Sequence, residues 1–151
     1  MIFSTDIEKQ TLDNTSYRKV LHTTDESQLV VMSVNSGEYI PAETHDDGTQ
    51  FIRVESGKGV ILGDGTEVQL SDGMSAMIPN NTSHHIKNVS NVPLKLYTLY
   101  SPPEHPAGRI DVRQIDSNVS RESDHSKVGI LGVVLGLLTL AFFLNNLRNI
   151  N

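Results

Sequence analysis

The chain has 151 residues, enough for one compact domain and an appendage, and its 12 Lys and Arg against 18 Asp and Glu give a formal net charge of −6. An acidic chain without a basic run lacks the electrostatic footprint of a nucleic-acid-binding protein, so we expect no nucleic-acid partner. The absence of cysteine excludes a disulfide framework and thiolate chemistry.

Short β-rich segments, separated by turn residues, fill most of the first hundred positions. Turn signals such as TDES, ESGKG, GDGT and SDG recur about every eight to twelve residues, which is typical of an all-β sandwich or barrel. No part of this region has convincing helical periodicity, so we expect no helix there. The predicted strands are residues 18–23, 28–34, 51–54, 59–62, 67–70, 75–79, 84–89 and 93–100.

The chain leaves the last predicted strand through the segment YSPPEHPAG at 100–108. Its three prolines exclude a central strand and favour an extended, rigid exit, in which His105 could cap the mouth of a barrel. Residues 111–127 are polar and aperiodic and are predicted to be a linker. The barrel with its N-terminal arm is therefore expected to cover residues 1–110.

Residues 128–144, VGILGVVLGLLTLAFFL, contain no charge, and Thr139 is their only polar side chain. Seventeen residues form a helix of about 25 Å, and extension to residue 147 gives the roughly 20 residues that span a bilayer. A helix buried in a globular core would be expected to show a polar face, and this segment shows none. The sequence thus predicts a C-terminal transmembrane helix at 128–147, followed by a short tail at 148–151.

The flanks of this segment suggest how the protein would be oriented. The N-terminal residues MIFSTDIEKQ lack the apolar run of a secretory signal peptide. Arg121 and Lys127 precede the apolar segment, whereas Arg148 follows it, which is a weak bias toward a cytosolic domain. We therefore expect a single-pass, C-terminally anchored membrane protein whose soluble domain is cytosolic.

Two segments carry residues typical of metal ligands. Glu43 and His45 stand two apart, so in a strand they share a face, and Gln50 opens the next strand, where its side chain can come back beside them. A second segment, GMSAMIPNNTSHHIKN at 73–88, places His84 five residues after a proline. Carboxylate, imidazole and amide groups together are ligands that divalent metals accept.

These two segments resemble the two signature motifs of the cupin superfamily. The first motif has a glycine, a His-x-His pair, a glutamate and a second glycine at fixed gaps, and the second has a glycine, a proline, a glycine, a histidine and an asparagine. The matching positions of the first motif here are Gly37, Glu43, His45, Gln50 and Gly57. Those of the second are Gly73, Pro79, Asn81, His84 and Asn88.

The resemblance covers roughly residues 18–105 and implies an all-β cupin, or jelly-roll, barrel. More narrowly, the YSPPEHP segment is similar to that of small single-domain cupins described as mannose-6-phosphate isomerase-like. It implies a divalent metal ion, Zn, Mn, Fe, Co or Ni, held by Glu43, His45, Gln50 and His84. Two of these ligands depart from the motif, because Glu43 replaces its first histidine and Gln50 replaces its glutamate.

The alternation of side chains along a strand predicts which of several other residues face the lumen and which face outward. Arg53 lies three after Gln50 and is expected to face away from the lumen and to pair with Glu55 or with Asp residues. His85 should face away from His84. Tyr97 and Tyr100 have opposite parity, so only one of them can line the lumen.

We therefore expect a membrane-tethered, metal-binding cupin that acts on or senses a small polar ligand such as a sugar or sugar phosphate. The catalytic residues are not identified, and isomerase activity follows from the resemblance alone. The alternative is a non-catalytic interaction module of a membrane-associated assembly, such as an organelle surface or a virion.

A homodimer is expected under either interpretation. Small cupins commonly pair, and the outward-facing Phe51 and Leu99 would leave apolar area exposed on a lone barrel. Gly132 and Gly136 have the spacing of close helix packing within a membrane.

Overall fold

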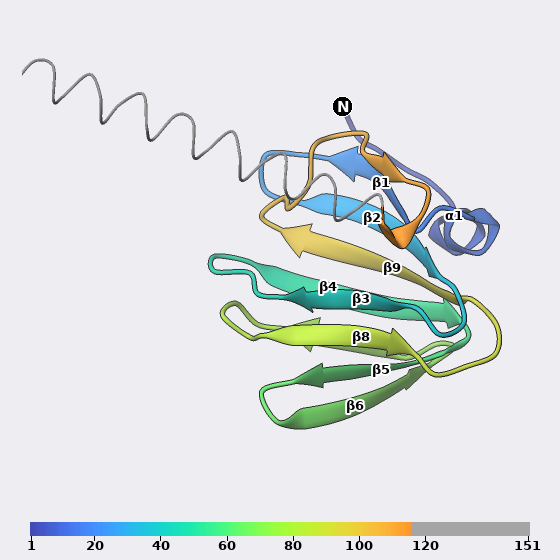
Figure 1. The fold of residues 1–151 in the computed structure, drawn as a ribbon. Helices are drawn as coiled ribbons and strands as arrows, with labels where there is room; N and C mark the ends of the chain where they lie inside the picture. Colours follow the sequence, from blue (N-terminus) through green and yellow to red (C-terminus); the bar gives the residue numbers. More distant parts are fainter. Residues whose placement is uncertain (116–151) are drawn as a thin grey trace, which may run out of the picture. The chain divides into compact units, whose positions relative to one another are not determined.

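The computed structural model describes residues 1–115 of the chain. One short helix precedes ten strands, which are coloured along the chain in Figure 1. The elements are α1 (Ile7–Asp13), β1 (Arg18–Thr23), β2 (Gln28–Val34), β3 (Tyr39–Glu43), β4 (Thr49–Ser56), β5 (Lys58–Gly63), β6 (Thr66–Ser71), β7 (Ser75–Ile78), β8 (His84–Asn88), β9 (Leu94–Ser101) and β10 (Ile110–Asp111).

Two antiparallel sheets form the domain, as the predicted all-β cupin architecture requires. The larger sheet has six strands in the order β10-β1-β2-β9-β4-β7, and the smaller has four in the order β3-β8-β5-β6. Strands that are distant in sequence are therefore neighbours, and β9 lies between β2 and β4 (Figure 1). This order brings the two motif segments to the same region of the molecule.

The space between the sheets is filled by aliphatic side chains. The six-stranded sheet contributes Val30, Ile52 and Leu96, and the four-stranded sheet contributes Ile40 and Ile86, each of them at most 1% exposed. Full burial of such a side chain stabilises the fold by about 1.5–3 kcal/mol. In the described part of the chain no β-ladder joins the two sheets, so this aliphatic core is what holds them together.

The helix α1 contradicts the expectation that this region contains no helix. Asp6 caps it by accepting a hydrogen bond from the Lys9 backbone N–H at 3.0 Å, and Lys9 forms an i,i+4 ion pair with Asp13 at 2.5 Å. Thr11 is its only buried residue. A seven-residue helix with one buried position is too short to produce a detectable apolar period.

The domain also continues beyond the boundary expected at residue 110. The compact unit extends from Met1 to Gln114, and β10 pairs with β1. Arg18, which is 2% exposed, donates a hydrogen bond from Nη1 to Asp111 Oδ2 at 2.9 Å. The start of the predicted polar linker is therefore a structural part of the barrel, secured by a buried ion pair.

The outer face of the six-stranded sheet has the polarity that strand alternation predicts. Arg53 forms an ion pair with Glu55 on this face, and Tyr97 packs against Phe51 with ring centroids 6.1 Å apart. Leu99 is directly opposite Phe51 in the ladder and is 39% exposed. The predicted apolar area on the outside of the barrel is therefore present.

The predicted transmembrane helix at 128–147 lies outside the described residues. Within residues 1–115, no helix has the length and apolar character needed to cross a membrane.

Three of the motif glycines, including Gly37 and Gly57, have positive φ, which favours glycine over any residue with a Cβ atom. Their surroundings differ. A Cβ atom on Gly37 would meet nothing within 4 Å, whereas one on Gly57 would lie 2.7 Å from the Pro93 carbonyl oxygen and 3.0 Å from Leu94 Cα. Gly57 thus allows the β4–β5 turn to touch the start of β9.

We therefore predict that Gly57→Ala destabilises the protein more than Gly37→Ala. Both changes carry the strain of a positive φ, of order 1 kcal/mol, but only Gly57→Ala adds a collision with backbone, worth about 1–3 kcal/mol more. Urea unfolding of the two variants measures the difference. Equal transition midpoints would show that the turn moves freely away from β9.

Candidate metal centre

Two rows of cross-strand neighbours face each other near one end of the barrel. In the six-stranded sheet, Tyr100 pairs with Gln28 on one side and with Gln50 on the other. In the four-stranded sheet, His84 pairs with Glu43 on one side and with Gly63 on the other. The polar side chains of these rows lie above the aliphatic core, and all of those just named are buried.

Glu43 reaches this position through an irregularity in β3. Ile40 pairs with Ile86, but Glu43 pairs with His84, so three steps along β3 match two along β8. Strict alternation would put Ile40 and Glu43 on opposite faces. A β-bulge at Pro41 and Ala42 turns both side chains into the barrel.

Asn81 joins the second motif to the first. Its φ of 59° is in the left-handed region, at the position where the family motif has glycine. In this conformation its backbone N–H donates to the His45 carbonyl oxygen at 2.8 Å. The loop before β8 therefore fixes the backbone of a candidate ligand.

The donor atoms of Glu43, His45 and His84 lie within 4.8 Å of one another. Glu43 Oε1 is 3.8 Å from both His45 Nε2 and His84 Nε2, too far for hydrogen bonds. Two ligands that are each about 2.1 Å from one metal ion are about 3.0–4.2 Å apart, depending on the angle between them. These separations fit three groups that face one cation.

Gln50 completes the cluster from the opposite sheet. Its amide nitrogen donates to Thr98 Oγ1 and Tyr100 Oη, each at 3.2 Å, which directs its Oε1 toward His84 Nε2 at 2.9 Å. Burial raises the pKa of Tyr100 far above its ordinary value, so the phenol keeps its proton. Gln50 is therefore held with its acceptor atom toward the cluster.

The orientation of the His84 ring is a test of whether this cluster suits a metal ion. Its Nδ1 lies 2.9 Å from the Thr82 carbonyl oxygen, and a carbonyl only accepts, so Nδ1 carries the proton in this contact. If Nε2 carries no proton, its lone pair faces the lone pairs of Gln50 Oε1 at 2.9 Å, whereas a proton on Nε2 would be donated to Gln50 Oε1. A metal ion bound to both atoms would satisfy both lone pairs, since two ligands 2.9 Å apart subtend about a right angle at one ion. A backbone carbonyl on the far nitrogen is a common support of a ligating histidine.

The side of the His45 ring that faces away from the cluster contacts the carboxylate of Glu104. His45 Nδ1 lies 3.1 Å from Glu104 Oε2, which leaves Nε2 directed toward the cluster. Glu104 first, and Glu43 second, raise the pKa of His45 to about 10. The environment of this ring therefore attracts positive charge, and a proton and a metal ion would compete for the Nε2 lone pair.

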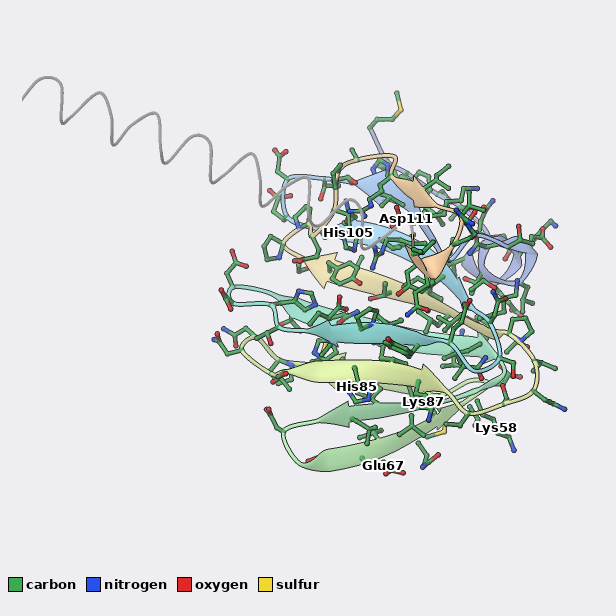
Figure 2. The ribbon with its side chains drawn as sticks, in the orientation of Figure 1. Lys58, Glu67, His85, Lys87, His105 and Asp111 are labelled. Carbon is green, nitrogen blue, oxygen red and sulfur yellow. The ribbon has the colours of Figure 1, made fainter. Side chains whose placement is uncertain are left out.

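The proline-rich segment after β9 covers this end of the barrel. Gln28 holds its backbone, because it donates to the His105 carbonyl oxygen at 2.6 Å and accepts from the His105 N–H at 3.0 Å. The His105 ring packs edge-on against Tyr100, with centroids 5.2 Å apart, and lies on the β1–β9 side of the barrel (Figure 2). The mouth position expected for His105 agrees with these contacts, although its ring is not part of the cluster.

The sequence interpretation missed four residues of the site: Gln28, Thr82, Thr98 and Glu104. Thr98 and Gln28 could have been found, since both share the inward parity of Tyr100 once β2, β9 and β4 are known to be neighbours. Glu104 gave no such signal, because it is in an irregular segment whose path depends on contacts with Gln28. Of the two tyrosines, Tyr100 lines the interior and Tyr97 lies outside.

The family is shown by comparison with known proteins. Residues 30–100 match the Cupin_2 model, described as a cupin domain. The chain is 42% identical over 123 residues to an uncharacterized protein, L612, of Acanthamoeba polyphaga mimivirus, covering 79% of this chain and 77% of that one. It is 33% identical over 121 residues to the uncharacterized protein YrkC of Bacillus subtilis, covering 76% of this chain and 65% of YrkC.

Solved structures agree with this assignment. The crystal structure of BH2720 from Bacillus halodurans matches with a TM-score of 0.78 and 34% identity, covering 79% of this chain and 95% of that one. KdgF from Halomonas sp. shares the fold, with a TM-score of 0.54 and 23% identity over 58% of this chain and 78% of that one. With its two-sheet barrel and the Glu43, His45 and His84 cluster that can hold a metal ion, the chain belongs to the cupin family.

Proposed function

We propose that this protein is a divalent-metal-binding cupin that presents its metal ion to a small polar ligand. Glu43, His45, Gln50 and His84 would be the protein ligands. The observation that carries the proposal is the convergence of buried donor atoms from both sheets, including the two acceptors Gln50 Oε1 and His84 Nε2 at 2.9 Å. Such a contact is unfavourable between two bare lone pairs and favourable when His84 Nε2 binds a cation, either a proton or a metal ion.

A divalent ion at this site would act as a Lewis acid that polarises an oxygen of the ligand. The protein contributes orientation. Thr98 and Tyr100 hold the amide of Gln50, the Thr82 carbonyl holds the ring of His84, and Glu104 holds the ring of His45. The mixed nitrogen and oxygen donors suit Zn, Mn, Fe, Co or Ni without selecting one.

The ligand we propose is a small molecule with hydroxyl or carbonyl groups, of which a neutral sugar is one example. A sugar phosphate would require a free cation in the lumen. The buried Arg18 is on the inward row of β1, but its Nη1 is bound to Asp111 at 2.9 Å. These contacts favour a neutral ligand over a phosphorylated one, and isomerase-like catalysis is suggested only by the resemblance of the motifs.

Neighbouring histidines of β8 allow a controlled test of metal binding. We predict that the purified full chain retains about one divalent ion, that His84→Gln weakens binding at least about tenfold, and that His85→Gln leaves it unchanged. His84 directs its ring into the cluster, whereas His85 is the next residue of the same strand (Figure 2) and is not part of it. Elemental analysis and competition with a chelator measure both quantities.

Glu104→Gln is a further variant for the same experiment, because it keeps the size of the side chain but removes the charge next to His45 Nδ1. Loss of such a supporting carboxylate typically weakens metal affinity about 10–100-fold. A wild-type chain without bound metal, or equal affinity in the His84 and His85 variants, would contradict the proposal and favour the non-catalytic interaction module.

We also propose that residues 128–147 anchor the domain in a membrane, as a single-pass C-terminal helix with the barrel in the cytosol. The support is the uncharged apolar run in the sequence. We predict that the full chain stays in the membrane pellet after alkaline carbonate extraction, and that Leu138→Lys with Phe142→Lys releases it, because charges near the bilayer centre are costly. Recovery of the wild-type chain in the soluble fraction would refute the anchor.

A homodimer through the outer face of the six-stranded sheet is the third element of the proposal. Leu29, Leu99, Phe51 and Met77 are successive neighbours across β2, β9, β4 and β7, and Met77 is 65% exposed. We predict that the wild-type chain is a dimer by sedimentation and that Leu99→Lys dissociates it, because burying this row contributes to association. Ser75→Lys, on the same face but outside the row, is the control, and a monomeric wild type would be the contrary result.

A further inference from the structure

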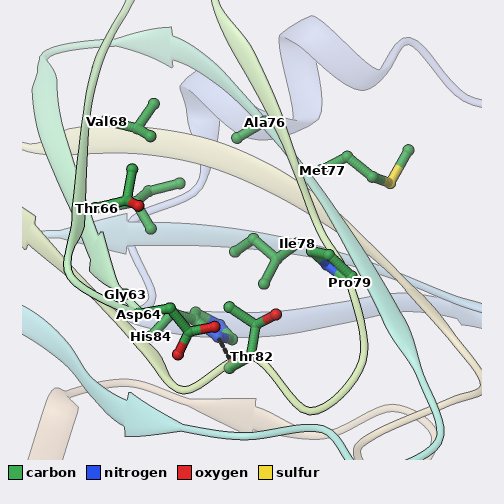
Figure 3. A pocket seen from close by; sticks show the side chains of 11 residues that line it. Gly63, Asp64, Thr66, Val68, Ala76, Met77, Ile78, Pro79, Thr82 and His84 are labelled. Carbon is green, nitrogen blue, oxygen red and sulfur yellow. Dashed lines mark hydrogen bonds between the residues drawn. The ribbon is translucent and has the colours of Figure 1, made fainter.

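A cavity of about 280 Å³ opens on the side of the barrel, where the β5–β6 hairpin of the four-stranded sheet faces β7 of the six-stranded sheet. We call it the lateral pocket. Its lining includes Ile61. Asp64, Val68, Ala76, Ile78 and His84 also line it and are labelled in Figure 3. β6 and β7 are edge strands of different sheets and share no hydrogen bonds, so the barrel is open between them.

The lateral pocket has an apolar body and a polar end. Val68 and Ala76 are at one end and Ile78 lines its middle, whereas Asp64, Thr82 and His84 gather at the other end (Figure 3). A dry apolar cavity of about 150 Å³ can bind benzene. The volume here is sufficient for a six-membered ring or a branched aliphatic group with a short polar substituent.

The charge of the lining restricts that substituent. Asp64 is in the turn between β5 and β6, with a φ of 48°, and is exposed at the rim. Among the described residues that line the pocket, none is Lys or Arg. A neutral or cationic head group is therefore favoured at the polar end, and a phosphate or carboxylate meets the like charge of Asp64.

The lateral pocket is adjacent to the candidate metal centre but distinct from it. His84 belongs to both, whereas Glu43, His45 and Gln50 do not line the pocket. The absence of a side chain at Gly63 lets the β5 backbone approach His84 closely, since a Cβ atom there would lie 3.0 Å from His84 Cβ. A molecule in the pocket would thus touch one face of a candidate ligand residue.

We propose that the lateral pocket is a binding site for a small amphiphile, with a cyclic or branched apolar group between the sheets and a neutral or cationic head at Asp64 and Thr82. The apolar group displaces water from Ile61, Val68 and Ile78, which provides the affinity. The head group provides selectivity against anions. This site does not require the metal ion.

Three probes that share one ring test the proposal: benzyl alcohol, benzylamine and benzyl phosphate. Each is titrated into the full chain with labelled Ile, Val and Ala methyl groups, in excess chelator and again with saturating zinc. We expect saturable shifts at Ile61, Val68 and Ile78 for the alcohol and the amine in both conditions. Benzyl phosphate should bind about tenfold more weakly, and Asp64→Asn should remove most of this difference.

Matched variants on β7 locate the binding. Ala76→Leu fills the pocket and should weaken benzyl alcohol at least about tenfold, whereas Ser75→Leu, the preceding residue of the same strand, should not. Val68→Phe, on the exposed edge strand β6, narrows the pocket from the other wall and replaces Ala76→Leu if that variant does not fold.

Absence of saturable shifts, equal binding of the phosphate, or unchanged affinity in the filled variants would overturn the proposal. Probe binding measured in excess chelator does not depend on whether the chain can hold a metal ion. A chain that binds no metal and a chain whose lateral pocket binds no probe therefore give different results.

Discussion

The buried amide of Gln50 is the constraint on which the site depends. An amide that is 1% exposed must find partners for its donors and its acceptor inside a barrel whose neighbouring layers are aliphatic, since each unsatisfied group costs about 1–3 kcal/mol. Thr98 and Tyr100 take the donors, which directs the acceptor toward the other sheet. His84 meets it there only because Thr82 orients the ring. Strand order, ring orientation and the chemistry of the cluster are thus linked through one side chain.

Much of the barrel could be predicted because the relevant signals are local. Turn chemistry at positions such as Gly57 and Asn81 depends on φ alone, and alternation in β4 placed Gln50 inside and Arg53 outside. The motif spacing brought His45 and His84 to one place, as the positions of their donor atoms confirm. Identification of the family from these positions agrees with the matched domain.

The remainder could not be predicted because it depends on contacts between distant segments. The bulge in β3 reverses the parity between Ile40 and Glu43, and no alternation rule anticipates it. Glu104 reaches His45 only because Gln28 holds the segment that carries it. Arg18 and Asp111 are 93 residues apart, so residue 111 appears as linker until β10 is seen beside β1. In each case tertiary structure, and not composition, decides the role.

The two ligand exchanges have a joint consequence for the charge of the site. In the family motif the first position is a histidine and the third a glutamate, whereas here Glu43 and Gln50 occupy them. Either exchange alone would change the formal charge of the four ligand residues by one unit, but the two exchanges together leave that charge unchanged. The negative charge has instead moved from the six-stranded to the four-stranded sheet, across the barrel. The ligand set around an ion at this centre would keep the same formal charge, but its carboxylate would be on the four-stranded side and its neutral amide on the six-stranded side. A molecule bound at this centre would therefore meet the negative ligand on the β3 side, and the uncharged amide on the β4 side.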